Sequence, residues 1–303
     1  MNDEFIYEHS LTHMLVAPTA ESVTMNTLTN MSEPLRSRAA NVTFLRRPAR
    51  FPSGRVLVLL HGIGSNAESF GALIQALSTP IDVIAWNAPG YGGSDALTNM
   101  SPRPSDYAAI LEQLLDALQL RSVVIAGHSL GALFAARFAA TYPDRVSALA
   151  LISPALGYRV KSGEPLPPVL QERIDEIRKI GPVAFGAKRA PRLVYDPDHR
   201  PQVVAAVEKA MSLVDVEGYI QAAHALGAGD LLADAACVSA PALVAVGAQD
   251  VITPPQNARR AHQALPGACI YREIEAAGHA VPQELPQTVA DLVGEFVERH
   301  ANV

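Results

Sequence analysis

The chain has little cysteine, no long apolar run and no excess of positive charge. Its 303 residues include two cysteines, too few for a disulfide framework, so we expect Cys237 and Cys269 to be small buried side chains. No apolar run approaches the roughly 18 residues of a membrane-spanning helix. The net charge is −6, whereas a chain that mainly binds nucleic acid needs a basic face. We therefore expect neither a membrane nor a nucleic-acid partner.

The sequence also lacks the signals of export, of metal binding and of phosphate binding. It begins MNDEFIYEHS, with acidic residues where a signal peptide carries basic ones and without an apolar segment after them, so we expect a cytoplasmic location. No His, Cys and Asp cluster has the spacing of a metal site, and no glycine-rich loop precedes a phosphate-binding lysine. We expect no metal and no cofactor. Residues 1–41 have no clear period, and we assign this N-terminal extension no role.

What the sequence does contain is a regular alternation of strands and helices. Hydrophobic residues make up 49% of the chain and charged residues 18%, which is enough to bury a large core. From Val42 onward, short apolar runs typical of buried strands alternate with segments of helical period. The apolar runs are 42–47, 55–60, 82–86, 123–127, 146–153, 241–250 and 269–275. This pattern predicts an α/β fold with a mostly parallel central sheet and helices on both faces.

The alternation stops at Pro154 and resumes near residue 241. Between them the sequence has helical periods joined by proline-rich segments such as SGEPLPPVL, and it contains no strong strand. We therefore predict a core formed by residues 42–154 and 236–303. The segment 155–235 is predicted to be a helical insertion that covers the ligand-binding end of the sheet as a cap.

Three residues whose side chains could take part in catalysis each follow a different predicted strand. The motif GHSLG at 127–131 places Ser129 where a strand turns into a helix, while Asp250 and His279 follow the last two strands. Ligands bind beyond the carboxyl ends of parallel strands, so we expect these three residues on one rim. A Gly-x-Ser-x-Gly turn exposes the hydroxyl of a strained serine above the sheet. The chain order Ser, Asp, His occurs in catalytic sets in which a serine nucleophile is combined with an acid and a base.

Each of these residues also has a plainer interpretation. Ser129 fits a tight turn as a small residue, Asp250 can cap a helix, and His279 can be an ordinary histidine. We favour catalysis because all three lie at strand ends. We expect His128 to point away from the site, since adjacent strand residues face opposite sides, and we interpret His61 as a structural hydrogen-bonding residue.

The chain resembles the α/β-hydrolase superfamily over about residues 43–303. The resemblance rests on five segments: HGIGSNAESF, WNAPGYGGSD, GHSLGA, GAQDVITPP and AAGHAVPQELP. It implies that Ser129 is the nucleophile, that His279 is the general base, and that Asp250 orients this base. It further implies an oxyanion hole formed by the backbone N–H groups of Ile63 and Leu130.

Two subfamilies look most similar. The stretch from VEGYIQAAHALG to ITPP looks like 3-oxoadipate enol-lactonases, whereas HGIG looks more like hydrolases that cut a carbon–carbon bond of aromatic ring-cleavage products. Those hydrolases commonly carry Asn before the serine and Trp after the histidine, where this chain has His128 and Ala280. Asn87 also departs from the superfamily, since many members carry Asp before the Pro-Gly, but that position is usually structural.

The resemblance implies a serine hydrolase of a small carboxylic ester or an enol-lactone. Three alternatives remain open: hydrolysis of a carbon–carbon bond, acyl transfer or perhydrolysis by the same three residues, and non-catalytic ligand binding on this fold. The predicted cap carries five cations with no acidic residue among them: Arg178, Lys179, Lys188, Arg189 and Arg192. They form either a solvated basic face or a contact to a substrate carboxylate. The sequence does not predict the oligomeric state.

Overall fold

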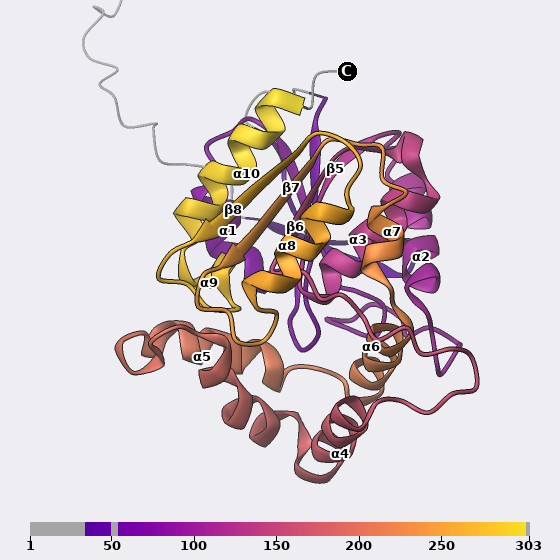
Figure 1. Cartoon of the computed structure of the whole chain (residues 1–303), viewed down its shortest axis with the longest axis vertical. Coiled ribbons are helices and arrows are strands. Elements are labelled where there is room, and N and C mark those ends of the chain that lie inside the picture. The colour runs from indigo at the N-terminus through magenta and orange to yellow at the C-terminus, as the bar shows by residue number, and fades with distance from the viewer. Residues whose placement is uncertain (1–33, 50–53, 301–303) are drawn as a thin grey trace, which may run out of the picture. The chain divides into compact units, whose positions relative to one another are not determined.

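One sheet organises the chain. The computed structural model describes residues 34–49 and 54–300, and in them eight strands follow the order β1-β2-β4-β3-β5-β6-β7-β8 (Figure 1). The pairs β1–β2 and β2–β4 are antiparallel, and all other neighbours are parallel. The strands are β1 (Leu35–Ala39), β2 (Val42–Arg47), β3 (Val56–Leu60), β4 (Asp82–Trp86), β5 (Val123–His128), β6 (Val146–Ile152), β7 (Ala242–Gly247) and β8 (Cys269–Ile274). The predicted mostly parallel α/β sheet is confirmed.

Alternate side chains of each central strand enter two different cores. In β3, Val58 and Leu60 belong to the core on one face, and Leu57 and Leu59 belong to the core on the other, as the two-residue period of a strand requires. The first core is covered by α2 (Pro104–Ala117), α3 (Leu130–Thr141) and α8 (Pro255–Ala264), and the second by α1 (Gly71–Ala76) and α10 (Pro286–His300). Burial on both faces explains why these strands form continuous apolar runs in the sequence.

The sheet begins at Leu35 rather than at Val42. Strand β1 therefore lies inside the segment 1–41, for which no element was predicted. Most of its side chains are exposed, and Ala40 and Asn41, with φ angles of 46° and 63°, form the two-residue turn to β2. An exposed edge strand has no hydrophobic period by which a sequence pattern can detect it. The remainder of the N-terminal extension, residues 1–33, lies outside the described residues.

The segment between β6 and β7 is helical and contains no strand, and all of its residues are described. Figure 1 shows its three long helices together at the end of the sheet where β7 and β8 finish. These helices are α4 (Pro168–Arg189), α5 (Pro201–Ser212) and α6 (Val216–Ala228). Helix α4 is broken where Gly181, with φ 74° and ψ 165°, precedes Pro182, because proline removes a helical hydrogen bond.

The last helix of the predicted insertion contacts the core. Helix α7 (Leu231–Ala235) packs beside α3, and Asp234 Oδ1 lies 2.7 Å from Arg137 Nη2 of α3. The C-terminal end of the predicted insertion 155–235 thus contacts the core through α7.

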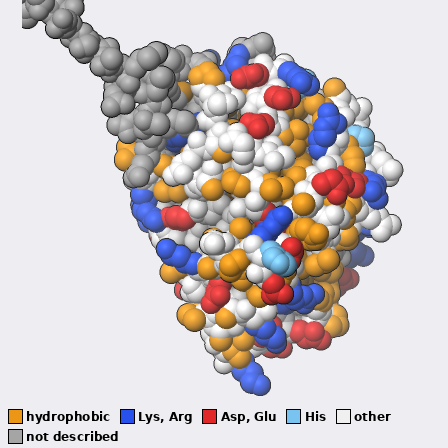
Figure 2. All heavy atoms as spheres, turned by 90° about the vertical axis from the view of Figure 1, so that its left-hand side faces the viewer, with side chains coloured by type: hydrophobic (Ala, Val, Ile, Leu, Met, Phe, Trp, Pro, Cys, Tyr) orange, Lys and Arg blue, Asp and Glu red, His pale blue; other side chains and the backbone are white. Residues whose placement is uncertain are grey.

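The surface mixes charge signs. On the face that Figure 2 shows, acidic and basic side chains are scattered among hydrophobic ones. Within residues 34–49 and 54–300, no helix combines the length and the apolar character that crossing a membrane requires. Cys237 is exposed and Cys269 is half-buried, and both are free thiols. The expectation that both are buried is wrong, because Cys237 lies in the turn between α7 and β7.

Candidate active site

Ser129 lies in a strained turn between β5 and α3. Its backbone has φ 55° and ψ −115°, outside the regions that residues other than glycine favour, and its N–H donates to the carbonyl of Ile152 at 2.9 Å. A Cβ on Gly127 would lie 2.3 Å from the oxygen of Gly131, and a Cβ on Gly131 would lie 2.0 Å from the oxygen of Leu60. Both flanking glycines are therefore required, because the strand and the helix approach too closely for a side chain.

Asp250 and His279 form a buried, hydrogen-bonded pair. Asp250 follows β7, and His279 lies between β8 and α9 (Val281–Glu284). Nδ1 of His279 is 2.9 Å from Oδ2 of Asp250, while Oδ1 accepts from the N–H groups of Ile252 and Thr253 at 2.8 and 2.9 Å. Burial alone would raise the pKa of Asp250, but His279 and these amides outweigh it and lower the pKa to about 2. The carboxylate is consequently ionised at neutral pH.

Thr253 is a further member of this group that the sequence analysis missed. Its Oγ1 lies 2.9 Å from Oδ2 of Asp250, 3.1 Å from Nδ1 of His279 and 2.9 Å from the carbonyl oxygen of Ser153. A hydroxyl has one proton to donate, so it goes either to Asp250 or to Ser153. In both arrangements the backbone N–H of Thr253 donates to Oδ1 of Asp250 and holds the carboxylate. The spacing of three residues after Asp250 is the available sequence signal, since Asp commonly accepts from nearby backbone groups in such turns.

His128 lies beside His279 rather than away from it. Its Nε2 is 2.8 Å from the carbonyl oxygen of His279, and the two ring centroids are 5.0 Å apart. Burial and the neighbouring His279 lower the pKa of His128 to about 3, so the ring is neutral and donates from Nε2. The expectation that His128 points away is wrong, because strand alternation ends at this residue and the positive φ of Ser129 turns the chain.

The loop that carries His279 is also connected to the helical insertion. The N–H of Gly278 donates to Oε1 of Glu284 at 2.9 Å, and the N–H of Tyr195 donates to Oε2 at 2.8 Å. The side chain of Glu284 has no exposed area, and Arg200 lies 3.1 Å from its Oε2. The placement of His279 therefore depends on the core and on the insertion together.

His61 and Asn87 hold the neighbouring loops. Nε2 of His61 accepts from the N–H of Ala88 at 3.0 Å, and burial lowers the pKa of His61 to about 4. Oδ1 of the fully buried Asn87 accepts from the N–H of Ala67 at 2.9 Å, and Nδ2 donates to Oγ1 of Thr43 at 3.0 Å. These contacts agree with the structural roles expected for both residues.

Two backbone N–H groups near Ser129 are available to an anion. Leu130 is the first residue of α3, so its N–H has no partner within the helix, and the helix end adds positive potential. Ile63 follows β3, and its N–H makes no hydrogen bond with a backbone group of the described residues. A Cβ on Gly62 would lie 3.0 Å from Cβ of Ser129, which places the Ile63 loop directly against the serine.

Ser129 and His279 line two cavities in common. The smaller has a volume of about 30 Å³ and also touches His128, and the larger has a volume of about 290 Å³ and also touches Thr253. The insertion supplies walls of both cavities. The residues that it contributes to both are Leu193 and Met211.

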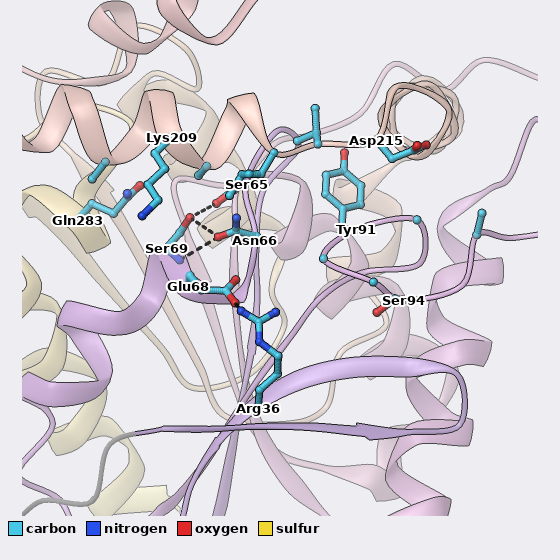
Figure 3. A pocket seen from close by; sticks show the side chains of 18 residues that line it. Arg36, Ser65, Asn66, Glu68, Ser69, Tyr91, Ser94, Lys209, Asp215 and Gln283 are labelled. Atoms are coloured by element: carbon cyan, nitrogen blue, oxygen red, sulfur yellow. Dashed lines mark hydrogen bonds and ion pairs between the residues drawn. The ribbon is translucent and has the colours of Figure 1, made fainter. Parts of the chain in front are cut away.

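A wider cavity of about 880 Å³ lies next to the smaller one. Figure 3 shows Lys209 of α5 on one side of it and Arg36, which pairs with Glu68, on the other. The wide and the small cavity share three lining residues: Ser65, Ala210 and Gln283. The wide cavity therefore borders the small cavity that Ser129 lines.

One of the five cations singled out in the sequence lines the larger cavity at Ser129. That residue is Arg189. The other four are exposed and line neither cavity at Ser129: Arg178, Lys179, Lys188 and Arg192. Two arginines that the sequence analysis did not consider, Arg173 and Arg260, line the same cavity. Nothing in the sequence singled them out, because packing decides which face of α4 and of α8 turns toward the site.

Comparisons with known proteins cover most of the chain. The model of the family described as "alpha/beta hydrolase fold" matches residues 55–284. The chain is 29% identical over 256 residues to (E)-2-((N-methylformamido)methylene)succinate hydrolase of Acinetobacter baylyi, a match that covers 81% of this chain and 91% of that protein. It is 29% identical over 253 residues to pimeloyl-[acyl-carrier protein] methyl ester esterase of Chromobacterium violaceum, with 82% and 96% covered.

A solved structure has the same architecture. The enol-lactonase from Burkholderia xenovorans LB400 matches with a TM-score of 0.75 at 24% identity, covering 88% of this chain and 99% of that one. At this identity the likeness concerns the fold. The family model, in contrast, spans the chain from β3 to α9 and includes the serine turn as well as the Asp250 and His279 loops. The protein therefore belongs to the α/β-hydrolase fold family.

Proposed function

We propose that the protein is a serine hydrolase that cleaves a small carboxylic ester or enol-lactone through an acyl-enzyme on Ser129. One observation carries this proposal. Ser129, in its strained turn, and His279, hydrogen-bonded to the ionised Asp250, line the same two cavities. A nucleophile, a base and a group that orients the base are the parts that acyl transfer to serine requires.

In the first step Oγ of Ser129 attacks the carbonyl carbon of the substrate, and Nε2 of His279 takes the hydroxyl proton. Asp250 accepts a hydrogen bond from Nδ1–H, which leaves Nε2 free of a proton in the resting state and stabilises the imidazolium that forms. The backbone N–H of Thr253 holds Oδ1 of Asp250 in place. His128 fixes the backbone of His279 from the other side.

Negative charge develops on the carbonyl oxygen during the attack. The N–H groups of Ile63 and Leu130 stabilise it, because preorganised donors act where the charge appears. His279 then delivers its proton to the leaving alkoxide or enolate oxygen as the bond from the acyl carbon to this oxygen breaks. In the second half, His279 deprotonates a water that attacks the acyl carbon, and the acid is released as Ser129 regains its proton.

The names of the relatives support hydrolysis of an acyl compound. One is a hydrolase of a substituted succinate, and the other is a methyl ester esterase. Acyl transfer, perhydrolysis and hydrolysis of a carbon–carbon bond would use the same three residues, and analysis of the products separates them. We also propose the cytoplasmic location expected from the start of the sequence.

Turnover of a panel of esters and enol-lactones tests the proposal. The wild-type protein should release the acid and the alcohol or enol, and Ser129→Ala should reduce release to the background rate. Turnover that persists in Ser129→Ala would contradict the role of this serine. Binding of the panel without turnover by the wild type would instead favour a ligand-binding protein.

A further inference from the structure

The cavity of about 290 Å³ beside Ser129 carries positive charge without matching negative charge. Its lining includes three arginines, and none of the described residues that line it is acidic. Two of the arginines come from the insertion, namely Arg173 and Arg189 of α4, and Arg260 comes from α8 of the core. Arginines from two parts of the fold thus line the cavity next to the proposed nucleophile.

The partners of these arginines leave most of the charge uncompensated. Arg173 donates from Nε and Nη2 to the neutral hydroxyl of Tyr219 at 3.1 and 2.6 Å. Arg189 stacks on Phe185 with its guanidinium carbon 5.1 Å from the ring centroid, and its Nη1 is 3.9 Å from Glu176. Glu176, however, also pairs with Lys188, so one carboxylate serves two cations.

Arg260 is exposed, lines the same cavity and has no ion pair among the described residues. The position of Arg189 is electrostatically unfavourable, since burial and the charge of Arg173 lower its pKa. Arginine nevertheless stays protonated in proteins, and its planar donors suit a carboxylate. An anion in the cavity would relieve this repulsion.

We propose that the substrate carries a carboxylate, which Arg189 and Arg260, assisted by Arg173, bind in this cavity while the scissile carbonyl group lies at Ser129. The proposal rests on the proposed function, because it takes Ser129 as the reacting residue. The cavity lies at the small end of ligand pockets, which span roughly 300–1,000 Å³. A short acyl chain with a terminal carboxylate therefore fits better than a long one.

The test compares an acid with its neutral ester on protein that cannot turn over. In the Ser129→Ala background, monomethyl glutarate and dimethyl glutarate are titrated by calorimetry. We expect the acid to bind about tenfold or more tightly than the diester, as hydrogen bonds to a charged group imply. Adding Arg189→Gln or Arg260→Gln should remove most of this preference. The control is Arg178→Gln, which should leave the preference unchanged, because Arg178 lies in α4 but lines neither cavity at Ser129.

Two results would overturn the proposal. One is equal binding of the two compounds, or no binding of the acid at all. The other is a preference for the acid that persists in both Arg189→Gln and Arg260→Gln. Because binding is measured without turnover, either result differs from failure of the proposed function, which would appear as a wild-type protein that binds the acid and hydrolyses no ester.

A kinetic measurement on active protein completes the test. The 4-nitrophenyl half-ester of glutarate and its methyl-capped diester present the same scissile bond to Ser129. Arg189→Gln and Arg260→Gln should lower kcat/KM for the half-ester by about tenfold each and leave that for the diester within a factor of about two. An equal loss for both esters would assign these arginines to folding of the insertion and contradict the proposal.

Discussion

Nε2 of His128 lies 2.8 Å from the carbonyl oxygen of His279, so the residue before the proposed nucleophile holds the residue proposed as the base. Both residues line the small cavity together with Ser129. His128 is a positioning residue in this account, because it acts through the backbone of His279. This relationship and those around it lead to four predictions.

Replacing His128 by Phe removes the donor and keeps a ring of similar size. We expect kcat to fall by about tenfold, the effect of losing one buried hydrogen bond, with KM little changed. His128→Gln can still donate to the carbonyl of His279 and should recover most of the loss. A Phe variant with wild-type kcat, or a Gln variant as impaired as Phe, would contradict the positioning role.

Replacing Asp250 by Asn removes the charge that stabilises the His279 imidazolium and keeps the shape of the side chain. We expect kcat/KM to fall by about 10³- to 10⁴-fold, as in other serine enzymes with this substitution. Thermal unfolding of the variant serves as the control for folding. A variant that folds and retains activity within tenfold of the wild type would remove Asp250 from the mechanism.

The pH dependence of kcat/KM should have a single acid limb. Protonated His279 cannot accept the proton of Ser129, so activity falls as the pH is lowered. Asp250, with a pKa of about 2, stays ionised above pH 5, and His61 and His128, with pKa values of about 4 and 3, stay neutral there. The fall of kcat/KM that accompanies protonation of His279 should therefore have a slope of one. A slope of two above pH 5 would show that a second group must also lose a proton and would contradict this account.

Asp234 should make the fold less stable as the pH rises. Its Oδ1 pairs with Arg137, but its Oδ2 is buried without a hydrogen-bond partner among the described residues. Burial outweighs Arg137 and raises the pKa of Asp234 to about 6. The native state thus binds this proton more tightly than the unfolded chain, so the stabilisation is complete below the unfolded pKa of 3.8 and is lost as the pH rises through about 6.

The measurement for Asp234 is the difference between the wild type and Asp234→Asn in the free energy of unfolding. Between pH 5 and pH 7.5 the wild type should lose about 1.5 kcal/mol relative to the variant. The comparison within one pH series cancels the other titrating groups. Parallel pH profiles of the two proteins would show that Asp234 titrates equally in the folded and unfolded states.

The residues that end strands were predictable, and those that depend on packing were not. The apolar runs fix the parallel strands, and the carboxyl ends of these strands locate Ser129, Asp250 and His279 along the chain. Strand β1 was not predicted, because an exposed edge strand lacks a hydrophobic period. Arg173 and Arg260 were not predicted as site residues, because they come near Ser129 only when the insertion and α8 pack around the cavity.

The central claim is that Ser129 is an activated nucleophile, and labelling with a fluorophosphonate followed by peptide mass mapping tests it most directly. Such probes react with an activated serine and leave an ordinary one unchanged. The account predicts a single labelled site at Ser129 in the wild type, strongly reduced labelling in His279→Ala, and none in Ser129→Ala. A wild-type protein that stays unlabelled, or that is labelled at another residue, would contradict the account.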